Sequence, residues 1–300
     1  MKRLIASLAA CAMLALSSPS EAAHYVAGAE GFLAAALPKE GGYFKLYNSF
    51  YHAEQYRNNS RHSSSGNGQL STFNQTYRLG YNTGVTIPLI GASWIVDLCL
   101  DYGYYKASGQ FIGQPKNTGS RHVSGLTDVH LCPLLLHWHG DRWDFFISPE
   151  VYFPTGDYSK NKPLNLGTNY YGFLLATGVN YWIDAEKTIA IGGRAIYEHN
   201  YTNKDTHSRE GSAMHLELSA GKMFSNGIYV ALDYCGDWQI RDDQGNPNFA
   251  GRYTRNAIGA EVGYLHKEWG AMFTLKYLSD FSNKNKPQGD FFQFCVLKTF

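Results

Sequence analysis

The sequence predicts an all-β protein: a closed, antiparallel, up-and-down transmembrane β-barrel of about 12 strands. Three observations carry this prediction. Apolar and polar side chains alternate along many stretches, the connections between these stretches alternate between long and short, and the last stretch ends in an aromatic residue, Phe300. The 300 residues also include 22 Tyr, 17 Phe, 6 Trp and 31 Gly, a composition that suits strands with one face in lipid.

A clear example of the alternation lies within residues 93–107. One face carries Trp94, Val96, Leu98, Leu100, Tyr102 and Tyr104, and the other carries Ile95, Asp97, Cys99, Asp101, Gly103 and Tyr105. Residues 143–153 and 228–239 repeat this period of two. Successive side chains of a strand point to opposite faces, so one face would meet lipid and the other a polar interior. A soluble β-sandwich would alternate in the same way, so the connections have to decide.

The connections favour a membrane barrel. The predicted strands are residues 42–56, 70–88, 93–107, 125–138, 142–155, 169–183, 188–202, 212–224, 227–241, 253–266, 270–281 and 290–300. Long polar connections are expected at 57–69, 108–124, 156–168, 203–211, 242–252 and 282–289, and short ones at 89–92, 139–141, 184–187, 225–226 and 267–269. Bacterial barrels have long extracellular loops, short periplasmic turns and an even number of strands. Residues 41–300 are therefore expected to form the barrel, with both of its ends in the periplasm.

The N-terminal residues have the features of a secretory signal peptide. Lys2 and Arg3 precede an apolar stretch at residues 4–16, and small residues then place cleavage after Ala22. We therefore expect residues 1–22 to direct Sec-dependent export to the outer membrane of a Gram-negative bacterium. The alternative is a lipoprotein signal, in which residues 8–11 form a lipobox and Cys11 carries the lipid. Residues 23–40 are expected to form a periplasmic extension or a plug, and the sequence leaves both open.

The C-terminal stretch predicts two partners. Phe292, Phe294, Val296 and Phe300 share one face. A terminal aromatic residue after alternating apolar residues resembles the signal that the barrel-assembly machinery recognises, so we expect this machinery and outer-membrane lipid as partners. Lys298 interrupts the apolar face, but a lysine near the membrane surface can extend its amine into water.

Several function classes are disfavoured. The net charge is +1 and no basic tract occurs, which argues against a nucleic-acid partner. No Gly-x-Ser-x-Gly occurs, and His215 with Glu217 is the best acid–base pair that the sequence offers, so an outer-membrane hydrolase ranks last. No CxxC or HxxxH spacing occurs, so neither a metal site nor a cofactor is expected.

Strand parity assigns most charged residues to the barrel interior. The candidates for a solute path are Asp101, Tyr105, Asp128, Glu150, Tyr152, Tyr170, Arg194, Glu198, His215, Glu217, Asp237, Gln239 and Arg241. They could line a path for a small-molecule solute, or they could pair with one another and close a narrow lumen. If a path exists, the excess of acids would disfavour anionic solutes.

Four cysteines remain after the predicted cleavage, and all have inward parity: Cys99, Cys132, Cys235 and Cys295. Cys99 and Cys132 fall on neighbouring strands at similar distances from their shared loop. In the oxidising periplasm they could form a disulfide, or both could remain buried free thiols.

A resemblance to a known family supports the barrel. It rests on Gly125-Leu126-Thr127-Asp128, Pro133-Leu134, residues 152–158 (YFPTGDY), residues 164–170 (LNLGTNY), His215-Leu216-Glu217, Ser225-Asn226-Gly227, and Gln239 with Asp242. Together these resemble the outer-membrane family named for the meta-pathway of phenol degradation, from about residue 41 onward. The resemblance implies a porin-like barrel that admits hydrophobic or aromatic compounds.

Residues 154–169 also have a physical interpretation of their own. Pro154 and Gly156 turn the chain out of the barrel, and Asn165 and Asn169 can hydrogen-bond the loop backbone and fold it over the mouth. Such a loop would be either a gate or a rigid cap. The function expected overall is passive uptake of small molecules, hydrophobic or aromatic ones among them, and the alternative is a closed barrel with a structural or adhesive role.

Overall fold

The computed structural model describes residues 24–25, 27–63, 68–112, 119–246 and 249–300. The signal-peptide prediction for residues 1–22, with its alternative at Cys11, lies outside the described residues. The strands are β1 (Gly41–Arg57), β2 (Leu70–Ile87), β3 (Ala92–Ala107), β4 (Arg121–Leu126), β5 (Val129–His139), β6 (Trp143–Phe153), β7 (Gly172–Trp182), β8 (Ile189–Asn200), β9 (Ala213–Met223), β10 (Ile228–Gln239), β11 (Thr254–His266), β12 (Ala271–Asp280) and β13 (Lys286–Thr299). A short 3-10 helix, η1, covers Gly109–Ile112.

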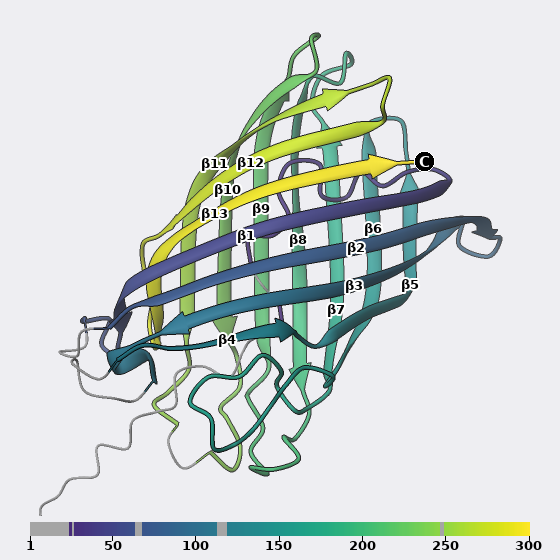
Figure 1. Cartoon of the computed structure of the whole chain (residues 1–300). Helices are drawn as coiled ribbons and strands as arrows, with labels where there is room; N and C mark the ends of the chain where they lie inside the picture. The colour runs from purple at the N-terminus through teal and green to yellow at the C-terminus, as the bar shows by residue number, and fades with distance from the viewer. Residues whose placement is uncertain (1–23, 26, 64–67, 113–118, 247–248) are drawn as a thin grey trace, which may run out of the picture.

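All of these strands belong to one antiparallel sheet that closes on itself (Figure 1). Apart from β4 and β5, strands that follow one another in the chain pair with each other, and β1 pairs with β13. β4 and β5 both pair with β3 and are two parts of one strand, so the barrel has 12 strands as predicted. The interruption between them is a β-bulge. Tyr102 opposes Leu126 and Cys99 opposes His130, so between these two pairs the chain advances by three residues on β3 and by four on the other strand.

The seam between the first and last strands closes at Phe300. The backbone of Gly42 donates to the carbonyl of Phe300 at 2.9 Å, and the backbone of Phe300 donates to the carbonyl of Gly42 at 3.0 Å. A Cβ at position 42 would lie 2.3 Å from the Phe300 ring, so only glycine lets the ring pack there. Closure leaves no unpaired strand edge in the bilayer, where unpaired backbone groups are costly.

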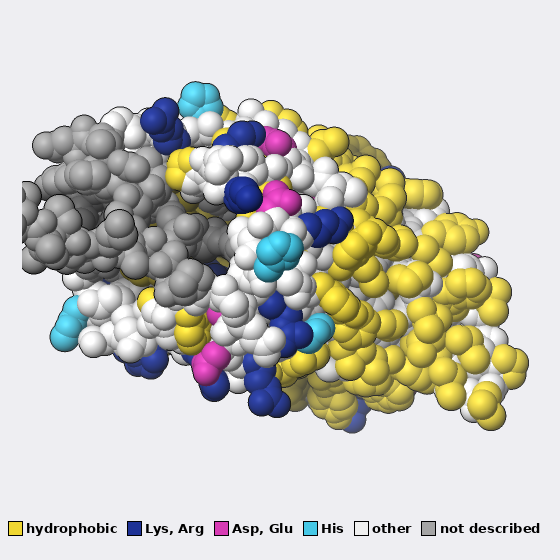
Figure 2. Space-filling view, turned by 90° about the horizontal axis from the view of Figure 1, so that it is seen from below, with side chains coloured by type: hydrophobic (Ala, Val, Ile, Leu, Met, Phe, Trp, Pro, Cys, Tyr) yellow, Lys and Arg dark blue, Asp and Glu magenta, His cyan; other side chains and the backbone are white. Residues whose placement is uncertain are grey.

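The two faces of the wall differ as the alternation predicts. On β3, the outward Leu100, Tyr102 and Tyr104 are about two-fifths exposed, whereas the inward Asp97 is 3% exposed. Figure 2 shows hydrophobic side chains covering the barrel wall, with charged side chains gathered over the loops. A soluble sandwich would bury these apolar rows between two sheets, but here they form the outer surface. Within the described residues, no helix is both long and apolar enough to cross a membrane.

The predicted strand bounds agree with the structure to within a few residues. The largest differences lie at loop-side ends. The predicted strand 169–183 begins only at Gly172, because Asn169 has a positive φ of 61°, and β13 begins at Lys286 because its pairing continues up to Arg57. The six long connections all lie at one end of the barrel, the loop end, and the five short ones lie at the other, the turn end.

Candidate solute path

The described residues of 24–40, here called the lumenal segment, run through the barrel from the loop end to the turn end. At the loop end, His24 bonds Thr168 at 2.8 Å. In the middle, the backbone of Gly28 donates to Glu217 at 2.6 Å. At the turn end, Asn82 of β2 donates to the carbonyl of Pro38 at 2.9 Å, shortly before β1 begins. The segment therefore lies along the axis that a solute would have to follow.

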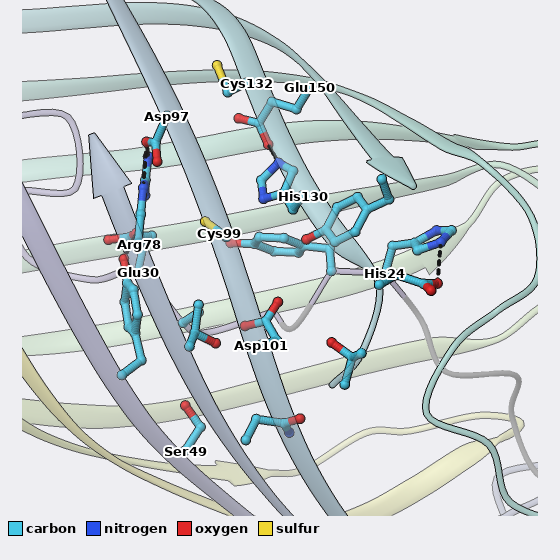
Figure 3. A pocket seen from close by; sticks show the side chains of 18 of the residues that line it. His24, Glu30, Ser49, Arg78, Asp97, Cys99, Asp101, His130, Cys132 and Glu150 are labelled. Carbon is cyan, nitrogen blue, oxygen red and sulfur yellow. Dashed lines mark hydrogen bonds and ion pairs between the residues drawn. The ribbon is translucent and has the colours of Figure 1, made fainter. Parts of the chain in front are cut away.

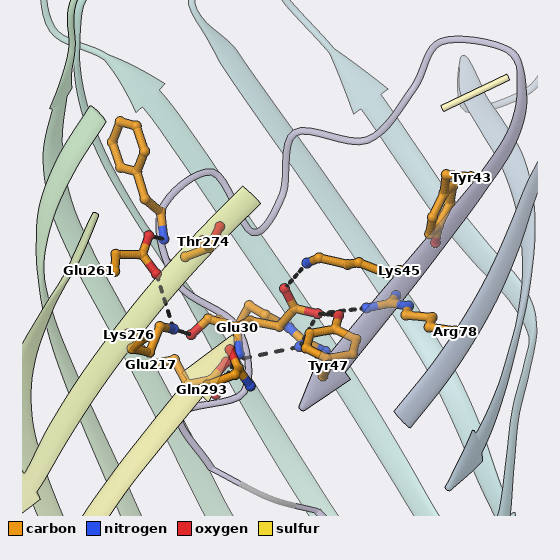
Figure 4. Close-up of polar contacts among 12 residues, drawn as sticks. Glu30, Tyr43, Lys45, Tyr47, Arg78, Glu217, Glu261, Thr274, Lys276 and Gln293 are labelled. Atoms are coloured by element: carbon orange, nitrogen blue, oxygen red, sulfur yellow. Dashed lines mark hydrogen bonds and ion pairs between the residues drawn. The ribbon is translucent and has the colours of Figure 1, made fainter. Parts of the chain in front are cut away.

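Glu30 ties the lumenal segment to three cations on the wall (Figure 4). Its carboxylate lies 2.5 Å from Lys45 Nζ, 2.8 Å from an Arg78 nitrogen and 3.9 Å from an Arg194 nitrogen, and it accepts a hydrogen bond from Tyr47. These five residues form the Glu30 layer. The Glu30 carboxylate contacts three buried cations, two of which, Arg78 and Arg194, also lie near Asp97 and Glu217, so removing it would leave Lys45 without a carboxylate partner among the described residues.

Lys276 forms a second anchor from β12. Its ammonium donates to the carbonyls of Gly28 at 3.2 Å and Glu30 at 2.6 Å, and lies 3.3 Å from Glu261. A Cβ at position 31 would fall 2.3 Å from Glu261 and 2.5 Å from the Lys276 amine, so the segment can approach this closely only with Gly31. The anchor thus depends on backbone groups of the segment rather than on its side chains.

Below the Glu30 layer, the segment fills the lumen with apolar side chains. Phe32 stacks on Tyr229 at a ring-centroid distance of 5.3 Å and meets Trp182 edge-on. Ala35 is fully buried in a cluster that also contains Leu135. The turn-end half of the barrel is therefore packed like the core of a globular protein.

His24 fixes the loop end of the segment. Its ring lies 3.4 Å from Asp128 and 3.6 Å from Glu198, with Tyr152 stacked on it at 4.8 Å and Tyr170 edge-on at 4.9 Å. Burial lowers the pKa of His24, but the hydrogen bonds and charges of Asp128 and Glu198 outweigh burial and raise it to about 9. At neutral pH the imidazolium therefore bridges two carboxylates of the wall, Asp128 between β4 and β5 and Glu198 of β8.

This bridge predicts a pH dependence. The folded-state pKa lies above the ordinary value of 6.5, so the stabilisation is complete below pH 6.5 and is lost as the pH rises through about 9. We expect the opening frequency of the purified protein in planar bilayers to rise between pH 8 and pH 10. The variant His24→Gln keeps a donor for Thr168 but has no proton to lose, so its opening frequency should not change over this range. An equal response of both proteins would refute the assignment.

Two cavities lie between the lumenal segment and the wall of β1, β2 and β3. The opposite wall carries long inward side chains. Several inward residues of the β1–β3 wall are short instead: Ser49, Thr72, Asn74, Thr76 and Gly103. The inner cavity has a volume of about 110 Å³ and the outer cavity, nearer the loop end, about 220 Å³. Tyr25, Ser49, Asn74 and Tyr105 line both, so the two cavities are adjacent. They form a continuous candidate path down to the Glu30 layer.

The inner cavity is polar (Figure 3). Arg78 pairs with Asp97 at 2.5 Å, and His130 bonds Glu150 at 2.9 Å. Asp101 also faces this space, level with Thr76 across the β2–β3 pair. Most of its charges are thus already bonded within the wall, which suits a surface that solutes pass rather than one that holds them tightly.

The loop between β6 and β7 folds back over the mouth. The backbone of Gly156 donates to Asp128 at 2.9 Å, and Asn165 bonds the backbone of residues 159 and 162. Asn169 reaches Asn203 of the next loop at 3.3 Å, and Pro154 stands where β6 has ended. Leu164 and Leu166 of this loop line the outer and inner cavities. The loop therefore covers the candidate path, and whether it acts as a gate or a rigid cap stays a prediction.

The structure brings most of the sequence-predicted candidates together. The inner cavity is lined by Asp101, Tyr105, Asp128, Glu150, Tyr152 and Arg194. The outer cavity is lined by Tyr105, His215 and Asp237. Glu198, Glu217 and Tyr170 contact the lumenal segment instead. Gln239 donates to Asp243 at the loop end, and Arg241 lies beyond the end of β10 with an exposed side chain, where strand parity no longer fixes its direction.

Sequence reasoning missed four charged residues that shape the path: Glu30, Lys45, Arg255 and Lys286. Lys45 has the same parity as Tyr43 and Tyr47, and Arg255 has that of Glu261, so the alternation could have assigned both. Lys286 was missed because β13 begins four residues earlier than predicted. Nothing periodic in the sequence marks Glu30, which belongs to no strand.

The cysteine alternatives resolve in favour of free thiols. Cys99, Cys132, Cys235 and Cys295 are all free and buried. The proposed bond between Cys99 and Cys132 is wrong because the register pairs Cys132 with Asp97, and Cys99 with His130. Cys132 instead lies 2.8 Å from the hydroxyl of Ser148. In the described part of the chain, no group of three or more His, Cys, Asp or Glu side chains could hold a metal ion.

A closed 12-stranded barrel with an apolar outer belt and buried charged side chains inside defines an outer-membrane β-barrel. The family model described as "Putative MetA-pathway of phenol degradation" matches residues 53–295. The chain belongs to this family, which confirms the resemblance seen in the sequence and places the protein in the bacterial outer membrane.

Solved structures agree on the fold. The COG4313 outer membrane channel from Pseudomonas putida F1 superposes with a TM-score of 0.72 at 15% identity, covering 88% of this chain and 97% of that one. The β domain of the Bordetella autotransporter BrkA gives a TM-score of 0.48 at 14% identity, covering 87% of this chain and 100% of that one. No match was found among curated proteins.

Proposed function

We propose that this protein is a channel for passive uptake of small molecules, which move along the two cavities between the lumenal segment and the wall of β1–β3. The observation that carries the proposal is the pair of adjacent cavities, which lead from the loop end to the Glu30 layer. The short side chains of this wall leave space beside the segment above the Glu30 layer, while the segment is bonded to Glu217 of β9 and Lys276 of β12.

The solutes we propose are small and at least partly apolar, such as phenol. Tyr51, Leu70, Leu164 and Phe291 give the outer cavity apolar walls. Apolar and aromatic walls with a few polar groups are typical of small-molecule sites. The description of the family names phenol degradation, which agrees with such a solute.

Passage beyond the Glu30 layer requires the lumenal segment to move, because Phe32 and Ala35 fill the lumen below it. Ala27 offers a way to prevent this movement, since it lies in the same buried cluster as Cys235 of β10. The variant Ala27→Cys adds a second thiol to this cluster, and a disulfide between it and Cys235 would fix the segment to the wall.

We expect Ala27→Cys to abolish protein-dependent uptake of phenol at low concentration. Uptake is measured in cells that lack the native gene and carry the wild type, Ala27→Cys, or the matched control Ala27→Ser. Reductant should restore uptake by Ala27→Cys and leave Ala27→Ser unchanged. If the wild type takes up no more than cells without the protein, the channel proposal fails. If the locked variant transports normally, the segment does not need to move.

The runner-up function is a closed barrel with a structural or adhesive role. The tightly paired Glu30 layer is the observation that favours it. The same uptake experiment separates the two, because a structural barrel would give no protein-dependent uptake with or without reductant. A hydrolytic role has less support: His215 bonds Glu198 and Asp237, and Glu217 accepts from the backbone of Gly28, so the two residues serve different contacts.

A further inference from the structure

The outer cavity carries a cation that the wall does not neutralise. Lys286, the first residue of β13, holds its amine 4.0 Å from the centre of the Tyr253 ring. Among the described residues no carboxylate lies within ion-pair distance of this amine, and its charge acts on Asp237 only from farther away. A cation on an aromatic face, at the edge of a cavity and without a carboxylate partner, is available to an anion.

The remaining charges of the cavity are already paired. Asp237 is the one acid among the described lining residues, and it bonds His215 at 2.6 Å and Arg255 at 3.3 Å. Arg255 also bonds Asp280 at 2.8 Å. Lys286 is therefore the one described lining cation without a carboxylate at ion-pair distance, although acids outnumber bases among the residues assigned inward by the sequence. The sequence-based expectation that anions are disfavoured counts every inward acid alike. In the outer cavity the one acid among the described lining residues, Asp237, is already bonded to His215 and Arg255.

The size and walls of the outer cavity suit one aromatic ring. A cavity of about 150 Å³ lined by apolar side chains binds benzene, and the outer cavity measures about 220 Å³. Leu164 of the covering loop, Leu70 and Thr72 of β2, and Phe291 of β13 line this space. Beyond a ring, the volume leaves room for one small substituent.

We propose that the outer cavity is a binding site for small aromatic carboxylates, with the ring between the apolar walls and the carboxylate paired with Lys286. This site would define the solute class of the uptake function proposed above. Its biological role rests on that function, whereas binding to the site does not. Benzoate is the simplest member of this class, and benzamide is its neutral counterpart with nearly the same shape.

The test measures binding of benzoate, benzamide and benzylamine to the purified, folded full-length protein by ligand-observed NMR. We expect benzoate to bind in the millimolar range or tighter, benzamide more weakly, and benzylamine least. The variant Lys286→Gln should weaken benzoate roughly tenfold, as expected for a lost charge-assisted bond, and leave benzamide unchanged. The matched control is Lys284→Gln, which removes the same charge two residues away from a lysine that does not line the cavity.

A second variant tests the cavity without changing its charge. Thr72→Phe adds a ring to the inward face of β2 and should exclude both benzoate and benzamide. Equal binding of benzoate and benzamide, an equal loss in Lys284→Gln and Lys286→Gln, or no effect of Thr72→Phe would overturn the site. Binding that depends on Lys286 without any protein-dependent uptake would instead refute the channel and keep the site, so the two proposals fail separately.

Discussion

Deletion of residues 24–38 is expected to raise the single-channel conductance at least about tenfold, because an unplugged 12-stranded barrel has room for water along its axis. The wall does not need the segment for strand pairing, since β1 begins at Gly41 and pairs with β2 and β13 along its length. The deletion removes Phe32 and Ala35, which fill the turn-end half of the lumen. Conductance of the purified protein in planar bilayers measures the effect.

The control for this deletion is Glu30→Gln. It keeps the chain length but removes the charge that balances Lys45, Arg78 and Arg194. Arg78 retains Asp97, so we expect frequent brief openings rather than a permanently open barrel. A deletion variant that migrates as a folded barrel on unheated gels and still conducts like the wild type would show that the segment is not what closes the lumen.

Replacing Phe300 with alanine is expected to reduce the amount of assembled barrel in the outer membrane roughly tenfold, which corresponds to about 1.4 kcal/mol. This free energy is comparable to that gained by burying one aromatic side chain. The ring packs over Gly42, at the seam where the last strand meets the first. We further propose that the barrel-assembly machinery recognises Phe300. Loss of the ring would then impair assembly before the barrel closes as well as destabilise the closed barrel.

The measurement is the heat-modifiable fraction of the protein in isolated outer membranes, with Phe281→Ala as control. Phe281 is also an exposed aromatic residue, but it lies past the end of β12 at the loop end, away from the seam. If both variants assembled equally well, or equally poorly, the last residue would have no special role. Gly42→Val tests the seam from the other side and should mimic Phe300→Ala if packing dominates.

The barrel could be predicted from the sequence because its two signals are local. Alternation along a strand follows from the two-residue period of side chains, and loop length is visible without any knowledge of pairing. The bulge between β4 and β5 was not foreseen, since it depends on which residue of β3 faces which residue of the partner strand. Residues 125–138 therefore appeared as one regular strand.

The site was predictable only in part. Parity identifies that Glu150, His215 and Asp237 point inward, but it does not say what lies across the lumen from them. His215 and Glu217 also contact Tyr25 and Gly28 of the lumenal segment, and those contacts exist only once the segment lies inside the barrel. Cavities are still harder to foresee, because the outer cavity results from short side chains on three strands at the same height.

The lumenal segment also changes how many times the polypeptide traverses the bilayer. Twelve strands alone would return the chain to the side on which it started, but the segment adds one more passage, inside the wall and without strand pairing. The described chain therefore makes an odd number of traverses. Its beginning at His24 lies at the loop end of the barrel, while its end at Phe300 lies at the turn end.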